Sequence, residues 1–392
     1  MSETSDAGQA TGSTTALTWM PDDELDGFVV ARVVAAPVTA GAPAAPAAAG
    51  RPDPIYALVR RPESPGPTEP HRPRGVVVHL HGYNDYFFQT HLADAIEAAG
   101  WAFLAVDARR AGRAWRPDEV PHYQEDLREQ GTDLTAAVAA ARAMFPDVPV
   151  VVHAHSTGGL VAALWAHAHR ERGGVDGLVL NSPFLSEQIG PVPVVTDEVL
   201  RALAAVRPLT TLSSRPSGYA ARLLAAGWVF DTDLKRPDGV PVRAGWLSAV
   251  RRGQTRLARG LEIACPVLVA HSDASGGEGE DNPDGDHQDT VLDVQTIATL
   301  APRLGPDVDV QVIAGGVHDL TLSAPEPRAA YLDALTAFLD RVAARPAAEP
   351  TPDATEPPTA EPPVLPAAAS EPAPTAPTPA PPEPDTPTAP TA

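Results

Sequence analysis

Several short apolar runs, rich in β-branched residues and bounded by glycine, proline or polar residues, recur along the chain. The clearest lie at residues 75–80, 102–107, 150–154, 177–181 and 266–270. They lack the polar alternation of a half-exposed strand, so they are typical of strands buried on both faces of a parallel sheet. Three further runs predict strands at residues 27–36, 55–61 and 308–314.

Segments with helical periodicity separate these runs. They predict helices over residues 89–99, 123–145, 290–304 and 326–344, and a helix that begins near Leu160. Alternation of buried strands with helices predicts an α/β fold with a mostly parallel, doubly wound sheet. In such sheets, binding and catalytic sites form at the carboxyl ends of the strands.

The alternation stops between residues 184 and 263, where the pattern is mostly helical and no clear buried strand occurs. We interpret this cap segment (residues 184–263) as a helical cap inserted after the strand that follows the Leu160 helix. Within the whole chain we expect a disordered N-terminus at residues 1–16, one α/β domain at 17–345, and a disordered Pro/Ala-rich acidic tail at 346–392.

Composition narrows the range of functions. The 392 residues carry a net charge of -21, which argues against binding to nucleic acid, because phosphate neutralisation needs a basic surface. Cys265 is the single cysteine, so neither an internal disulfide nor a thiolate metal site is expected. The N-terminus lacks the pattern of a signal peptide, and no apolar run has the length of a membrane-spanning helix. We therefore expect a soluble cytoplasmic protein; the sequence does not indicate its oligomeric state.

The run that ends at Ser156 differs from the others because a helical pattern begins immediately after it. Small residues flank the serine, with Ala154 two positions before it and Gly158 two positions after it. A strand that turns sharply into a helix at a serine is typical of a nucleophile elbow. The usual pattern is G-x-S-x-G, so Ala154 departs from it. The alternative interpretation is a serine that only caps the helix.

A serine nucleophile needs a base, and the base needs an acid that orients it. His318 follows the last predicted strand in a glycine-rich loop, which suits a base. Two residues are candidates for the acid. Asp273 lies directly after the strand at 266–270, whereas Asp289 lies beyond an acidic loop and opens a turn into a helix. We favour Asp289, which makes residues 274–288 an insertion, and keep Asp273 as the alternative.

The oxyanion that forms during acyl transfer needs fixed N–H donors. The backbone N–H of Thr157, directly after the serine and at the start of the helix, is one candidate. The second is the N–H of Tyr83, in the loop His81-Gly82-Tyr83 that follows the strand at 75–80. The order along the chain is then the loop His81-Gly82-Tyr83, the serine, the acid and the histidine.

These residues carry a resemblance to the α/β-hydrolase superfamily, most of all to monoacylglycerol-lipase-like hydrolases, also called the S33-type serine aminopeptidase group. The resemblance extends from about Val76 to Leu339. The matching motifs are His81-Gly82-Tyr83, Asp107 with the Arg/Gly loop, His155-Ser156-Thr157-Gly158-Gly159, Asp289-Thr290-Val291 and Gly316-Val317-His318. It implies an α/β-hydrolase fold with a Ser-Asp-His triad, no cofactor, no metal, and hydrolysis of an ester or amide through an acyl-enzyme. The sequence departs from the family pattern at Ala154, in the length of residues 274–288, and in the loop after Asp107.

The first substrate hypothesis is a small acyl compound, either a carboxylic ester or a monoacylglycerol. We expect an apolar acyl pocket formed by five side chains of the cap segment: Leu223, Leu224, Trp228, Phe230 and Trp246. An aminopeptidase would need a carboxylate for the substrate amine, which Asp231 or Asp233 could supply. Two alternatives come from other classes: a non-catalytic hydrolase-fold binding protein, and a metal-dependent hydrolase based on the histidine pairs His79-x-His81 and His153-x-His155.

Overall fold

The computed structural model describes residues 17–38, 52–62, 72–171, 174–186, 196–279 and 281–345. The two segments that we expect to be disordered, residues 1–16 and 346–392, lie outside the described residues. The described residues form one compact unit.

Nine strands of the described residues form one sheet, in the order β1-β2-β3-β5-β4-β6-β7-β10-β11. The pairs from β1 through β3 to β5 are antiparallel, and all pairs from β5 to β11 are parallel. The prediction of a mostly parallel α/β sheet is therefore confirmed. The strands are Met20–Pro21 (β1), Val29–Val34 (β2), Ile55–Arg60 (β3), Val76–Leu80 (β4), Ala102–Asp107 (β5), Val150–His155 (β6), Gly177–Asn181 (β7), Val267–Ser272 (β10) and Val308–Ile313 (β11).

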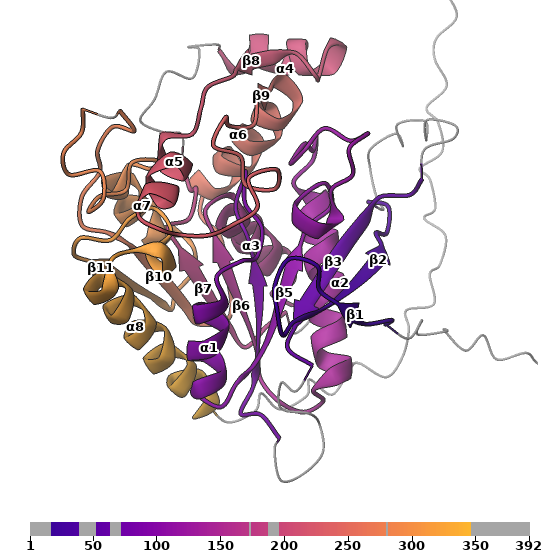
Figure 1. Ribbon diagram of the computed structural model, residues 1–392, viewed down its shortest axis with the longest axis vertical. Coiled ribbons are helices and arrows are strands. Elements are labelled where there is room, and N and C mark those ends of the chain that lie inside the picture. Colours follow the sequence, from indigo (N-terminus) through magenta and orange to yellow (C-terminus); the bar gives the residue numbers. More distant parts are fainter. Residues whose placement is uncertain are drawn as a thin grey trace, which may run out of the picture. The chain divides into compact units, whose positions relative to one another are not determined.

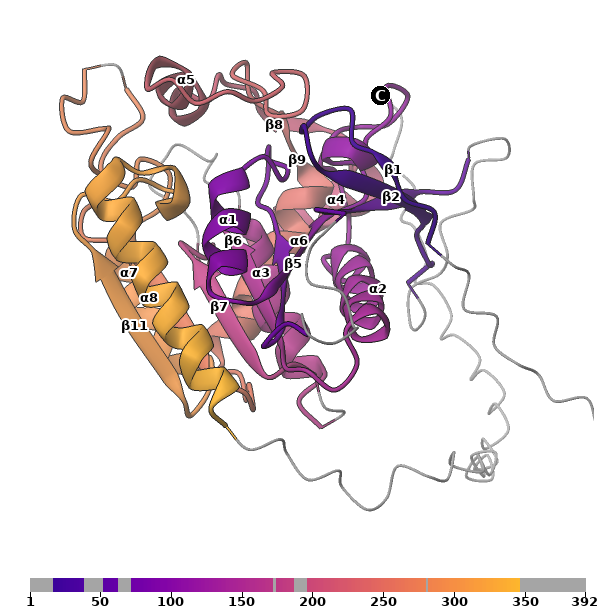
Figure 2. The ribbon, with the colours of Figure 1, turned by 60° about the horizontal axis from the view of Figure 1, so that its bottom comes forward.

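Helices cover both faces of this sheet (Figures 1 and 2). Buried side chains of α1 and α8 pack on one face, and those of α2, α3 and α6 pack on the other. The central strands β4, β5 and β6 have no exposed residue, which explains their continuous apolar sequences. The helices are Thr90–Ala98 (α1), Arg128–Met144 (α2), Thr157–Ala168 (α3), Asp197–Val206 (α4), Gly218–Ala225 (α5), Ala244–Ala258 (α6), Val294–Leu300 (α7) and Pro325–Ala343 (α8).

The register of the central strands brings the candidate site residues together. Leu80 of β4 pairs with Ala154 of β6, so the loop that starts at His81 lies beside the turn at Ser156. On the other side, β6 pairs with β7, and β7 pairs with β10. The carboxyl ends of these parallel strands form one edge of the sheet, where binding sites of α/β folds lie.

The cap segment contains α4, α5 and α6 and a small antiparallel sheet of two strands, Thr211–Ser213 (β8) and Val242–Arg243 (β9). Its helix α6 packs against α3. Further along the segment, Tyr219, Leu223 and Phe230 form a buried cluster with four residues from the loops after β4 and β11: Tyr86, Phe88, Val317 and Leu322. This packing places part of the cap segment over the loops at the carboxyl edge of the sheet.

Two predicted helices begin later than their apolar pattern suggested. The helix predicted from residue 290 begins at Val294, because the carboxylate of Asp293 accepts a hydrogen bond from the N–H of Gln295 and caps it. The helix predicted from residue 123 begins at Arg128. There, the side chain of Asp126 accepts a hydrogen bond from the N–H of Arg128, an interaction that competes with helical geometry.

Candidate active site

Ser156 occupies a sharp turn between β6 and α3. Its backbone has φ 52° and ψ -119°, a conformation that a residue with a Cβ atom rarely adopts. Two glycines make room for the turn. A Cβ atom on Gly158 would collide with the carbonyl oxygen of His81, and one on Gly159 would lie 2.8 Å from Cβ of Pro183. Ala154 is fully buried in β6, so its methyl group is accommodated two residues before the turn.

Ser156, His318 and Asp289 form a continuous chain of hydrogen bonds. Nε2 of His318 lies 3.0 Å from Oγ of Ser156, and Nδ1 of His318 lies 3.0 Å from Oδ2 of Asp289. A carboxylate can only accept, so Nδ1–H donates to Asp289 and leaves Nε2 as an acceptor for the serine hydroxyl. All three side chains are buried, with Asp289 0% exposed.

The loop between β10 and α7 explains how Asp289 reaches His318. The N–H of Asp289 donates to the carbonyl of Ala274, and the N–H of Gly276 donates to the carbonyl of Asp289. These bonds close the intervening loop at its base and return the chain to the end of β10. Oδ1 of Asp289 accepts hydrogen bonds from the N–H groups of Val291 and Leu292, which fix the carboxylate while Oδ2 faces the histidine.

The alternative acid, Asp273, is placed differently. Its side chain is exposed, and its Oδ1 accepts a hydrogen bond from the N–H of Gly315, three residues before His318. Of the two candidate acids, the structure brings only Asp289 into contact with the imidazole of His318. Asp273 instead ties the end of β10 to the loop that carries the histidine.

The two predicted oxyanion donors belong to segments that adjoin Ser156. Thr157 is the first residue of α3, so its N–H has no acceptor within the helix. In the other segment, a Cβ atom on Gly82 would lie 3.0 Å from Cβ of Ser156, which shows how closely the loop before Tyr83 approaches the serine. His81 fixes this loop: its Nδ1 lies 2.7 Å from the carbonyl oxygen of Gly82, and its Nε2 accepts a hydrogen bond from the N–H of Ala108.

A buried polar network next to these residues was not predicted from the sequence. The ammonium of Lys235 lies 2.9 Å from Oδ1 of Asp85, and both side chains are almost fully buried. Asp319, directly after the histidine, accepts hydrogen bonds from Gln89 and Asn181. Burial raises the pKa of Asp319, but electrostatic interactions with His155 and Lys235 and hydrogen bonds from Thr321 and Asn181 outweigh it and hold this pKa well below its usual range. The position of Asp319 beside His318 was the only sequence signal for this network.

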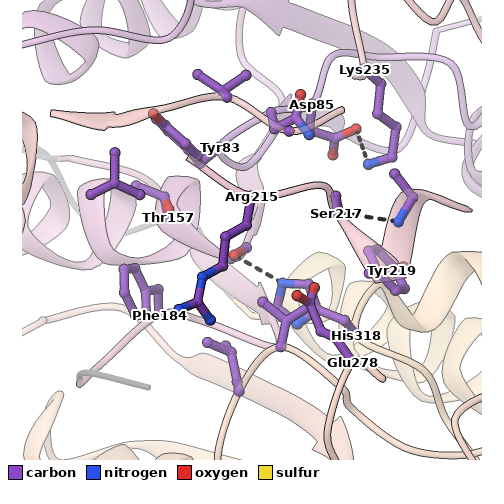
Figure 3. A pocket seen from close by; sticks show the side chains of 18 of the residues that line it. Tyr83, Asp85, Thr157, Phe184, Arg215, Ser217, Tyr219, Lys235, Glu278 and His318 are labelled. Atoms are coloured by element: carbon purple, nitrogen blue, oxygen red, sulfur yellow. Dashed lines mark hydrogen bonds and ion pairs between the residues drawn. The ribbon is translucent and has the colours of Figure 1, made fainter. Parts of the chain in front are cut away.

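A cavity of about 320 Å³ opens beside Ser156 and His318 (Figure 3). Apolar and aromatic side chains form most of its wall, among them Tyr83, Phe184 and Val291. The sequence predicted a different wall. Of its five cap residues, Trp246 lines the cavity, whereas Leu223, Trp228 and Phe230 belong to the neighbouring apolar cluster and Leu224 is 37% exposed.

Charged side chains also line this cavity. Besides the Lys235–Asp85 ion pair, they include Arg215 and Glu278, both labelled in Figure 3. The carboxylates considered for recognition of a substrate amine, Asp231 and Asp233, are exposed and do not line the cavity. Besides Asp85, which is paired with Lys235, Glu278 is the carboxylate among the residues that line the cavity. The sequence did not single it out because it lies in an acidic loop without a motif.

The structure brings the first histidines of the two sequence pairs, His79 and His153, into contact with each other. His79 and His153 lie in adjacent strands with their Nδ1 atoms 2.8 Å apart, and Nε2 of His153 lies 2.7 Å from the hydroxyl of Tyr331. Burial lowers the pKa of both, that of His153 to about 4. Among the described residues, the grouping with possible metal ligands is Asp85, His155 and Asp319, in which the Lys235 ammonium already lies against the Asp85 carboxylate.

No helix among the described residues is both long enough and apolar enough to cross a membrane.

Comparisons with known proteins show the family and the fold of the chain. The family model described as serine aminopeptidase, S33, matches residues 71–324. No curated protein matches the chain. A soluble variant of monoglyceride lipase from Saccharomyces cerevisiae, in complex with a substrate analog, is 15% identical; the match covers 86% of this chain and 99% of that chain, with a TM-score of 0.56.

Two further solved structures have similar folds. Monoacylglycerol lipase from Paleococcus ferrophilus is 18% identical over 69% of this chain and 95% of that chain, with a TM-score of 0.51. A carboxyl esterase from Bacillus coagulans, in complex with glycerol, is 16% identical over 74% of this chain and 94% of that chain, with a TM-score of 0.52. At these identities, the likeness establishes a shared fold.

Proposed function

This chain belongs to the serine aminopeptidase S33 family of α/β-hydrolases, and on that premise we propose that it is a serine hydrolase that cleaves carboxylic esters through an acyl-enzyme. The observation that supports the proposal is the hydrogen-bond chain from Ser156 through His318 to Asp289 at the carboxyl edge of the sheet. A weak nucleophile, a base and an orienting acid in mutual contact are what acyl transfer by serine requires.

In this mechanism Ser156 attacks the acyl carbonyl while Nε2 of His318 takes its proton. The negative charge of Asp289 stabilises the imidazolium that forms and keeps its Nδ1 protonated. The N–H groups of Tyr83 and Thr157 donate to the oxyanion, assisted at Thr157 by the helix dipole. His318 then returns the proton to the leaving alcohol, and water activated by the same histidine hydrolyses the acyl-enzyme.

The cavity supports a small acyl substrate. Its volume of about 320 Å³ is at the lower end of the range of small-molecule sites, and its wall is mainly apolar. We propose that the acyl chain lies against Phe184, Trp246 and Val291, beneath the cap segment, with the ester carbonyl at Ser156. Solved structures with this fold include monoglyceride lipases, so a monoacylglycerol is our first substrate candidate.

A second candidate is hydrolysis of an amide next to a free amine, as in an aminopeptidase. The carboxylate of Glu278 supports it, because it lines the same cavity as Ser156 and could pair with a substrate ammonium. The same catalytic residues would act in both reactions. The two candidates therefore differ only in the leaving group and in the need for a carboxylate in the pocket.

The purified protein should be assayed with p-nitrophenyl esters from acetate to decanoate, with a monoacylglycerol, and with aminoacyl p-nitroanilides. We expect ester turnover that survives the substitution Glu278→Gln. Turnover of anilides that is lost on the same substitution would instead establish the aminopeptidase candidate. A folded protein that hydrolyses none of these compounds would contradict the proposed ester hydrolase and favour a binding role for the fold.

A further inference from the structure

The loop that follows Gly82 is bonded, residue by residue, to a single stretch of the cap segment. We call residues 83–86 the oxyanion loop and residues 231–241 the strap. Asn84 exchanges two hydrogen bonds with the backbone of Arg236: its Nδ2 donates to the carbonyl at 2.9 Å, and its Oδ1 accepts from the N–H at 2.9 Å. Asn84 has φ 53°, so the loop turns back at this residue and presents the side chain to the strap.

The oxyanion loop is also bonded to both ends of the strap. At one end, the hydroxyl of Tyr83 donates to the carbonyl of Pro241 at 3.2 Å. At the other, the N–H of Asp231 donates to the hydroxyl of Tyr86 at 2.8 Å. Between these two points, Asp85 forms its ion pair with Lys235. All four residues of the loop thus contact the strap.

Lys235 is the only lysine of a chain that otherwise uses arginine, and it is 4% exposed. Its ammonium lies 2.9 Å from Asp85 and within 6.0 Å of the ring centres of Phe88, Tyr219 and Phe230. A compact ammonium fits between three rings and a carboxylate, whereas a planar guanidinium has a different shape and donor geometry. Separating this pair would leave a buried carboxylate without its counter-charge, so the contact holds the strap firmly to the loop.

We propose that the strap positions the oxyanion donor: Lys235 and Asn84 hold the oxyanion loop so that the N–H of Tyr83 faces Ser156. This inference rests on the proposed function. When the strap leaves the loop, the bonds of Tyr83, Asn84 and Asp85 to it break together and the donor loses its support. Binding of the acyl chain beneath the cap segment and stabilisation of the oxyanion are thereby coupled through one set of contacts.

Kinetics test this role with the variants Lys235→Met and Asn84→Gly. Methionine removes the charge at similar length, and glycine removes the amide while tolerating the positive φ of residue 84. Trp228→Phe is the matched control, since it deletes a single hydrogen bond from the cap segment, to the carbonyl of Leu322, and none to the oxyanion loop. Each protein is titrated with a fluorophosphonate, so that kcat is calculated per active site. A variant that is partly unfolded therefore does not give a falsely low kcat.

Loss of an oxyanion donor lowers kcat by about two orders of magnitude, so we expect at least a tenfold fall for both variants, with little change in KM. Trp228→Phe should retain the kcat of the wild type. A wild type that turns over esters while both variants keep its kcat would overturn the strap inference and leave the proposed function intact. A wild type without turnover would contradict the proposed function itself.

The single lysine offers a second readout that does not depend on activity. Acetylation of the native protein with acetic anhydride, followed by mass spectrometry of the peptide that contains Lys235, reports how often the strap leaves the loop. We expect slow acetylation in the wild type and in Trp228→Phe, and much faster acetylation in Asn84→Gly. Equal rates in Asn84→Gly and the wild type would show that the asparagine does not hold the strap, and would overturn the inference.

Discussion

Replacing Asp289 by asparagine changes a single atom next to the imidazole of His318. The N–H groups of Val291 and Leu292 donate to Oδ1 of Asp289, so the asparagine must keep its oxygen on that side. Its NH₂ group then faces Nδ1 of His318. Two donors cannot share this contact, so the histidine gives up its Nδ1 proton and carries one on Nε2 instead. In that tautomer the histidine cannot accept the proton of Ser156.

The structure sets the size of this effect. The carboxylate and the imidazolium would be 3.0 Å apart, and at an effective dielectric constant of about 20 their attraction is about 5.5 kcal/mol. Loss of that stabilisation in the transition state corresponds to a fall in kcat of about four orders of magnitude. The Coulombic and tautomeric effects describe the same contact, so they do not add.

Asp273→Asn is the matched control, because it makes the same chemical change at the other candidate acid. Its oxygen can still accept the hydrogen bond from Gly315, and the side chain is exposed. Hydrolysis of p-nitrophenyl acetate, with kcat taken per fluorophosphonate-titrated site or per folded molecule, should stay within about threefold of the wild type. An Asp289→Asn variant that keeps more than about a tenth of wild-type kcat would refute the assignment of Asp289.

Three further predictions concern stability and the elbow. Burial lowers the pKa of His79 and His153, so below pH 6.5 the unfolded chain binds more protons than the folded one. Each residue should then lower the free energy of unfolding by about 1.4 kcal/mol for each pH unit below 6.5. Urea midpoints that do not fall between pH 7 and pH 5 would contradict this. Ser156→Gly should raise the free energy of unfolding by about 1 kcal/mol, because glycine relieves the strain at φ 52°, and Ser156→Ala should not. Gly158→Ala should lower it by about 2 kcal/mol, since the new methyl group collides with the His81 carbonyl; calorimetry measures both effects.

The sheet could be predicted well from the sequence because strands buried in a parallel sheet have continuous apolar sequences. The strands at 102–107 and 177–181 have the predicted bounds, and the parallel direction of the central strands follows from their alternation with helices. The turn at Ser156 and the loop at His318 could be located because each follows such a run. These features are local, so a pattern of neighbouring residues is enough to reveal them.

The remainder of the site depends on contacts between distant residues. Asp85 and Lys235 are 150 positions apart, and no period or motif relates them. The prediction of which cap residues line the cavity was largely wrong for the same reason. Trp228 and Phe230 are apolar enough to line an acyl pocket, but in the structure they pack in the apolar cluster that contains Tyr86, Phe88 and Val317. Their apolar character predicts that such side chains are buried. Which residues they pack against depends on the tertiary fold.

The acid was harder to predict than the base for a structural reason. Asp273 directly follows an apolar strand, which made it a candidate, whereas the turn into a helix at Asp289 made Asp289 the favoured acid. Backbone hydrogen bonds of Ala274 and Gly276 with Asp289 close the intervening loop at its base. They place Asp289 beside the end of the strand. That pairing has no sequence signature.

The account depends most directly on Ser156 being an activated nucleophile. The measurement that tests it is labelling of the purified protein with a fluorescent fluorophosphonate, with the modified residue mapped by mass spectrometry and Ser156→Ala as the control. We predict a single stoichiometric adduct on Ser156, none on the alanine variant, and loss of ester turnover in proportion to labelling. A folded wild type that remains unlabelled, or that is labelled at another residue while Ser156 stays free, would contradict the central claim.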